Sequence, residues 1–172
     1  MTSTPERSCL EEWNQSQIRR SILACSGFTD LGMFQEAVRE LEALPESIRE
    51  STPILIAWLE LYQGWQKWSE AMAVAEHLVA REPGDPNWPV ALAYATRRGV
   101  SLKAALRILQ EAVLSFPNCA AIHFNLACYH AQLSQPEEAN LYLQQACKLD
   151  PSFRVTAQTD PDLAVLRQTN LS

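Results

Sequence analysis

Glycine and long apolar runs are scarce in this chain of 172 residues, which contains 5 glycines. The motifs GxGxxG and GxxxxGKS/T are absent, so we expect no phosphate-binding loop of either kind. No apolar run approaches the roughly 18 residues that a membrane-spanning helix requires. The opening residues MTSTPERSCLEEW lack the basic start and the apolar middle of a secretory signal. We therefore expect a cytoplasmic protein that does not insert into a membrane.

Positive charge is not in excess either, because the formal net charge at pH 7 is −6. A general nucleic-acid binder carries a basic stripe, so we expect no nucleic-acid partner. The 5 cysteines are odd in number and irregularly spaced, which favours reduced thiols used as small apolar side chains over a disulfide framework. Apolar residues make up 47% of the chain, enough for the core of one domain that we predict to span residues 1–172.

Histidine is rare, but two of the 3 histidines lie in the segment CAAIHFNLACYH, which also holds two cysteines. On a helix, Cys119, His123 and His130 fall on nearly the same side, and Cys128 points the opposite way. The two histidines are two turns apart, about 10 Å along the axis. A zinc ion holds imidazole nitrogens at about 2.0–2.1 Å, so it is not easily shared between them. We expect no metal and no cofactor.

An internal period of 34 residues organises the chain. Three prolines and four alanines recur at this interval: Pro83, Pro117 and Pro151, and Ala37, Ala71, Ala105 and Ala139. Seven residues in one register are improbable by chance, and such a period is the signature of repeat architectures. Two helices of about a dozen residues cannot bury their apolar faces alone, so the units must stack.

Each unit is predicted to contain two helices. The first helices are expected at 52–64, 86–98 and 120–133, and the second helices at 68–80, 102–115 and 136–148. Prolines at the starts and glycines or prolines at the ends support these limits.

The two ends of the chain are predicted to differ from the repeats between them. In the first unit, Ser8-x-x-Glu11 favours a helix that begins near residue 9, and Pro45 leaves PESIRES as an irregular connection. Ser134-x-x-Glu137 is a possible capping box of the same kind. After Pro151, Asp160-Pro161 is expected to start a short helix whose Leu163, Leu166 and Phe153 cover the last repeat.

This pattern resembles the tetratricopeptide repeat (TPR) family, whose unit of 34 residues favours small residues at positions 8 and 20 and proline at position 32. With Thr52, Pro86 and Ala120 as first positions, Ala93 and Ala127 occupy position 8. The resemblance implies an all-α, right-handed α-solenoid of about four antiparallel helix pairs. The tail resembles the segment that closes the array in many bacterial TPR proteins. The units expected from it are 9–51, 52–85, 86–119 and 120–151, followed by the cap 152–172.

The resemblance also gives the histidines a structural role. His123 and His130 occupy positions 4 and 11, which the family fills with aromatic side chains that pack against the neighbouring repeat. We expect both to be packing residues with one ring nitrogen satisfied.

The resemblance implies a function as well, since the first helices of such repeats line a concave wall that binds peptides or helices. Only Asn125 matches the clamp with which some TPR domains hold a C-terminal carboxylate. We therefore predict a non-catalytic scaffold or adaptor that binds a protein partner in a largely apolar groove. The expected groove residues, only partly buried in the free protein, are Ile22, Ile56, Glu60, Val90, Tyr94, Arg97, Phe124, Asn125 and Cys128.

Two other functions stay open from the sequence. Small acidic TPR proteins also act as secretion-type chaperones for a partner subunit, and the groove and ends could instead mediate self-association into a homo-oligomer. The N-terminal segment or a sister chain could also fill the groove. No arrangement of serine, histidine and aspartate supports catalysis, so we do not expect an enzyme.

The register of the repeat can be tested by enlarging one of its alanines. Ala105→Leu should lower the free energy of unfolding by about 1–3 kcal/mol, because the larger side chain overpacks a close helix contact. Ala80→Leu lies at a position predicted to be exposed and should change it by less than about 0.5 kcal/mol. Urea denaturation measures both, and equal effects would mean that the register is wrong.

Overall fold

The computed structural model describes the backbone of residues 5–169 and the side chains of residues 15–167. Every regular element in this part of the chain is helical, as predicted. The contacts between residues group the chain into two compact units, Met1–Val74 and Ala75–Ser172, which are described separately.

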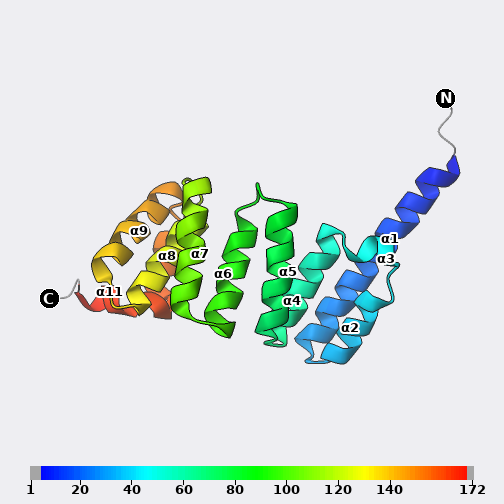
Figure 1. The fold of residues 1–172 in the computed structure, drawn as a ribbon, viewed down its shortest axis with the longest axis horizontal. Coiled ribbons are helices and arrows are strands. Elements are labelled where there is room, and N and C mark those ends of the chain that lie inside the picture. Colours follow the sequence, from blue (N-terminus) through cyan, green and yellow to red (C-terminus); the bar gives the residue numbers. More distant parts are fainter. Residues whose placement is uncertain (1–4, 170–172) are drawn as a thin grey trace. The chain divides into compact units, whose positions relative to one another are not determined.

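The first unit consists of helices that pack around a core of small and branched apolar residues (Figure 1). Its elements are α1 (Pro5–Asp30), α2 (Phe34–Glu42), α3 (Glu46–Arg49), α4 (Thr52–Gly64) and the beginning of α5 (Trp68–Arg81). Helices α1 and α2 form an antiparallel pair, and α4 packs against α1. The buried core consists of Cys25, Ala37, Leu41, Leu44, Ile54, Ala57 and Leu61.

The second unit continues with two further helix pairs and a C-terminal cap. It contains the end of α5, then α6 (Asn87–Gly99), α7 (Leu102–Ser115), α8 (Ala120–Gln132), α9 (Pro136–Leu149), α10 (Phe153–Thr159), the single 3-10 turn η1 (Pro161–Leu163) and α11 (Ala164–Thr169). The cap segments pack on α8 and α9 (Figure 1). Leu163 and Leu166 are buried in the same core as Leu109 and Leu126, so the predicted cover of the last repeat is confirmed.

The six helices predicted between residues 52 and 149 agree with the structure to within one residue at each end. The ends of the chain differ more. Helix α1 begins at Pro5, so Ser8 lies inside the helix and not at its start. PESIRES is not irregular but contains α3, because the Arg49 guanidinium donates from Nε to the Leu44 carbonyl at 2.7 Å and also to the Glu42 carbonyl. The tail forms α10 in addition to the short helix expected after residue 160.

The turn between the two helices of each unit has the same hydrogen bonding four times over. An amide just after the first helix donates to the carbonyl five residues back, which is the outer bond of a Schellman motif. These bonds join Met33 to Phe28 (2.8 Å), Lys67 to Tyr62 (2.8 Å), Ser101 to Thr96 (3.1 Å) and Gln135 to His130 (3.0 Å). The donors are spaced by 34 residues, so the divergent first helix pair follows the same backbone repeat as the others.

The residue before each of these donors occupies the position that favours a left-handed backbone. Gly32 has φ of +72°, and Gln66 and Ser134 have φ of +60°. The fourth equivalent, Val100, takes φ of −125° because a β-branched residue strongly disfavours the left-handed region. Ser134 therefore belongs to the end of α8, and its expected role in a capping box for α9 is wrong.

The left-handed turn generates a stability prediction. Ser134→Gly should raise the free energy of unfolding by about 0.5–1 kcal/mol, because glycine adopts a positive φ without the steric cost that serine carries. Ser115→Gly, at the end of α7, should instead lower it, since it adds chain entropy to the unfolded state with no strain to relieve. Thermal unfolding of both variants measures the difference. A loss of stability in Ser134→Gly would contradict the proposed strain.

Candidate functional site

A groove in the first unit runs between helices α1 and α4. Its volume is about 280 Å³. Helix α1 contributes residues one turn apart, Ile22, Ser26 and Asp30, and α4 contributes Ala57 and Glu60. Because residues four apart lie on one helical face, each helix turns a single face to the groove.

The two helices approach each other closely at the floor of this groove. A Cβ atom on Gly64 would lie 2.8 Å from Cγ2 of Thr29, so only glycine fits there without a shift of the neighbouring atoms. The Thr29 hydroxyl donates to the Cys25 carbonyl at 2.8 Å, which fixes the orientation of its methyl group. Burial is the main cause that raises the pKa of the Cys25 thiol above its ordinary value. The floor is therefore packed and unreactive, and the groove opens above it.

The walls and the rim of the groove differ in character. Ile22 and Ala57 supply apolar walls, and the side chains of Asp30 and Glu60 are exposed at the rim. The sequence analysis predicted Ile22 and Glu60 as groove residues, and the structure brings them to the same groove. Ile56 is half-buried on α4 and does not line it.

Two predicted groove residues lie on α6 in the second unit. Val90 is half-buried and packs against the core. Tyr94 is 38% exposed, and the Arg98 guanidinium lies over its ring at 5.2 Å from the centroid. Tyr94 is therefore a partly accessible aromatic residue beside a cation.

The remaining predicted residues lie on α8, and two of them, Phe124 and Cys128, lie against the C-terminal cap. The Phe124 ring stacks on Phe153 with centroids 4.6 Å apart, and Phe124 is only 6% exposed. Cys128 is buried as well, and the Asn125 amide donates to the Ala121 carbonyl of its own helix at 2.9 Å. The expected partial burial of Phe124 and Cys128 is wrong, because the chain folds its own tail over this helix.

Arg97 connects α6 to the cap. Its Nη2 atom donates to Oδ1 of Asp162 at 3.0 Å, and Nη1 donates to the other carboxylate oxygen. The guanidinium also lies over the buried Tyr129 ring at 5.3 Å. The hydrogen bonds to Asp162 raise the pKa of Arg97 further, against the opposing effect of burial. Arg97 thus serves to hold the cap and is not a free charge at a groove rim.

Cys128, Asp160 and Asp162 form the group of potential metal ligands in the described part of the chain, with ligand atoms within 4.8 Å of one another. All three already have structural roles. Asp160 accepts from the Asp162 amide at 2.8 Å and caps η1, and Asp162 pairs with Arg97. Burial, followed by the neighbouring carboxylates, raises the pKa of the Cys128 thiol to about 12. A thiol that stays protonated is a poor metal ligand and a poor nucleophile.

The two histidines of α8 lie on either side of the Tyr142 ring, with centroids 5.9 Å from it for His123 and 5.3 Å for His130. His123 Nε2 lies 2.7 Å from the Pro117 carbonyl, and His130 Nδ1 lies 2.8 Å from Oε1 of Gln135. The predicted packing role with one satisfied ring nitrogen is confirmed for both.

Sequence reasoning missed Asp162, Thr29 and Asp30. Asp162 follows no repeat period and meets Arg97 across 65 residues of chain. Thr29 and Asp30 lie in the last turn of α1, beyond the predicted Ile22, and Thr29 lies where α1 closely approaches Gly64.

Comparisons with known proteins agree with the fold described above. Residues 120–153 match the tetratricopeptide repeat family. No curated protein matches the chain. Among solved structures, TTC0263, a thermophilic TPR protein in Thermus thermophilus, is 21% identical with a TM-score of 0.65, covering 91% of this chain and 82% of its own.

Two further structures share the fold at similarly low identity. MamA (41-end) from Desulfovibrio magneticus RS-1 is 19% identical with a TM-score of 0.59, covering 78% of this chain and 76% of its own. A putative kinesin light chain from Podosopora anserina with nearly identical TPR-like repeats is 22% identical with a TM-score of 0.58, covering 90% and 87%.

The chain therefore has the helical fold of tetratricopeptide-repeat proteins, and its segment 120–153 matches that family by sequence as well. Proteins of this fold in general mediate protein–protein interactions and are not catalysts. Among the helices within residues 5–169, none is both long and apolar enough to cross a membrane.

The attachment of the cap can be tested at its ion pair. Asp162→Asn should lower the free energy of unfolding by about 1–3 kcal/mol, because the partly buried Arg97 charge loses its charged partner. Glu76→Gln, an exposed change of the same kind on α5, should shift it by less than about 0.5 kcal/mol. Urea denaturation compares the two, and equal shifts would show that the pair does not hold the cap.

Proposed function

We propose that this protein is a non-catalytic interaction scaffold that binds a peptide or helix of a partner protein in the groove between α1 and α4. The observation that carries the proposal is the groove itself, with apolar walls at Ile22 and Ala57 above a packed floor. Apolar grooves of this kind receive amphipathic helices or extended peptides, and the apolar side chains of the occupant supply most of the affinity.

The charge of the rim indicates the charge that the partner segment carries. Asp30 and Glu60 are both acidic, and none of the residues that line the groove is basic. Complementary charge steers association and fixes the register of the bound segment. The proposed partner segment therefore presents apolar side chains to the walls and lysine or arginine to the rim.

The chemistry of the described residues supports a role without catalysis. Burial raises the pKa of both Cys25 and Cys128, so neither thiol is poised as a nucleophile. His123 and His130 are buried against Tyr142 and are only 7% and 6% exposed. A general base must reach the proton that it abstracts, and these rings face the interior.

The proposal is tested by a variant at the wall of the groove. A photo-crosslinking amino acid at Ser26 should first capture the partner, which mass spectrometry identifies. Ile22→Asp should then weaken binding of the purified partner at least tenfold, because a carboxylate in the apolar wall would have to lose its hydration when the partner binds. A loss of about 1.4 kcal/mol in binding free energy is enough for a tenfold change. Isothermal titration calorimetry gives the dissociation constants.

Arg39→Glu is the matched control, because it also changes charge in the first unit but lies on the exposed face of α2. It should leave the affinity unchanged. Unchanged binding in Ile22→Asp together with weakened binding in Arg39→Glu would place the partner on another face. If Ser26 crosslinks only to a second copy, and light scattering shows a mass that rises with concentration, the groove mediates self-association and the proposal is wrong.

A further inference from the structure

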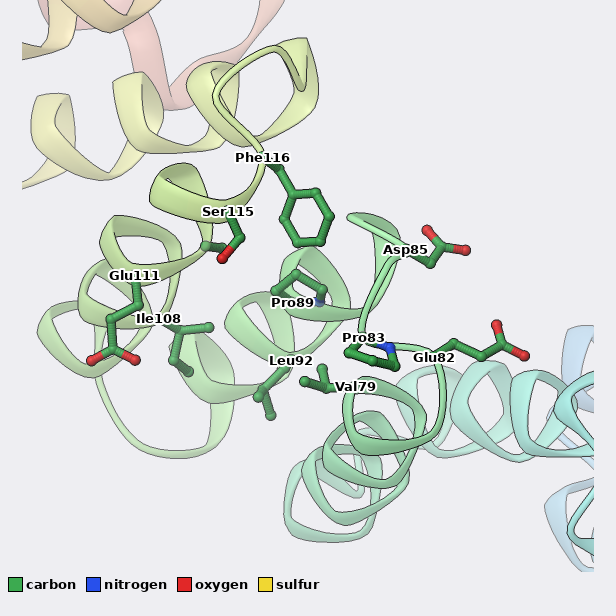
Figure 2. A pocket seen from close by; sticks show the side chains of 11 residues that line it. Val79, Glu82, Pro83, Asp85, Pro89, Leu92, Ile108, Glu111, Ser115 and Phe116 are labelled. Atoms are coloured by element: carbon green, nitrogen blue, oxygen red, sulfur yellow. The ribbon is translucent and has the colours of Figure 1, made fainter.

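A second hollow lies in the second unit and shares no lining residue with the groove between α1 and α4. Its volume is about 300 Å³, near the lower limit for ligand pockets, so it suits one side chain. It lies where the end of α5, the start of α6 and the end of α7 meet (Figure 2). Its apolar lining consists of Val79, Pro83, Pro89, Leu92, Ile108, Ala112 and Phe116, and most of these residues are half-buried.

The repeat explains why this hollow exists. Pro83, Pro89 and Ile108 line it, and the residues 34 positions later are Pro117, His123 and Tyr142. In that next repeat the His123 ring occupies the corresponding place. It contacts the equivalents of the other two residues, with Nε2 at 2.7 Å from the Pro117 carbonyl and a tilted contact to the Tyr142 ring.

Pro89 cannot fill the same space. Its ring is shorter than an imidazole on a Cβ, and it carries no side-chain N–H to donate to a carbonyl. Ile108 likewise replaces the larger Tyr142. These two smaller side chains leave an apolar hollow in the second unit, whereas His123 and Tyr142 fill the corresponding space in the next repeat.

The edge of the hollow is acidic. Figure 2 shows the carboxylates of Glu82 and Asp85 on one side of the apolar residues and that of Glu111 on the other. Arg81 and Arg107, each within four residues of one of these glutamates in sequence, do not line the hollow. Three carboxylates and no lining cation give this edge a negative potential.

We propose that this hollow, which we call the Pro89 pocket, binds an aromatic side chain carried by a basic peptide segment of a partner protein. The aromatic ring takes the place that His123 fills in the next repeat, and a ring N–H, as in indole, donates to the Pro83 carbonyl. The flanking lysine or arginine residues of the peptide face Glu82, Asp85 and Glu111. Aromatic rings bury a large area at low entropic cost, which suits a pocket of this size.

The test uses the full chain labelled at the isoleucine methyl groups, because Ile108 is the isoleucine that lines the pocket. The probe is the capped tripeptide Arg-Trp-Arg, with Arg-Ala-Arg and Glu-Trp-Glu as comparison peptides. Arg-Trp-Arg should shift the Ile108 methyl resonance saturably, through the ring current of the indole. Both comparison peptides should bind at least tenfold more weakly, one for lack of the ring and the other for its charge.

Pro89→His restores the side chain of the next repeat and should weaken Arg-Trp-Arg binding at least tenfold. Pro89 is the third residue of α6, where its nitrogen has no partner within the helix, so the replacement is compatible with the backbone. Pro53→His, near the start of α4, is the matched control and should leave the affinity unchanged. Glu111→Lys alters only the exposed edge of the pocket, so it provides a test even if Pro89→His fails to fold. It should weaken binding of Arg-Trp-Arg at least threefold.

Several results would overturn the proposal. They are an Ile108 resonance that does not respond to Arg-Trp-Arg, equal binding of Arg-Ala-Arg, and full affinity in Glu111→Lys or in folded Pro89→His. An Ile108 shift that grows with protein concentration without peptide, and disappears in Pro89→His, would identify a second copy as the occupant and overturn the basic peptide. Ile22→Asp should not affect this titration, so the proposal for this pocket and the proposal for the groove between α1 and α4 are tested independently.

Discussion

The close approach of neighbouring helices at one small residue per repeat is the constraint on which the rest of the structure depends. Ala37, Ala71, Ala105 and Ala139 are all fully buried. Without a bulky side chain at these places, two helical backbones can pack closely enough to exclude solvent from the apolar side chains around them. At Gly64 the neighbouring helices are so close that even a Cβ atom would meet Thr29.

The helices could be predicted from the sequence because their signals are local or periodic. Proline marked the starts of α4 and α9, and the alanine period placed the second helices of each unit. The positive φ at Gln66 and Ser134 could not be predicted in this way, since neither residue favours it and only the repeat imposes it. The α3 turn was missed because it depends on where the Arg49 side chain finds carbonyl partners.

The candidate site was predictable only in part, and the reason is the sequence distance between the contacting residues. Ile22 and Glu60 follow from position in the repeat, and both line the groove of the first unit. Phe124 follows from the same rule, yet it is covered by Phe153, which lies beyond the last predicted unit, 120–151. The departure from an aromatic residue at Pro89 was visible in the sequence. That it leaves an open hollow required the structure, because a neighbouring side chain could have moved in to fill it.

The cap has a consequence for how such an array can change length. It contacts two successive first helices through specific residues, Arg97 on α6 and Phe124 on α8. The residues 34 positions earlier are Gln63 and Val90, which offer neither a charge nor an aromatic ring. The tail therefore fits one pair of helices and would not fit the pair before it. A gene duplication that adds a repeat upstream of residue 86 leaves these contacts intact. The loss of the unit 120–151 would instead remove Phe124 and leave the tail without this contact.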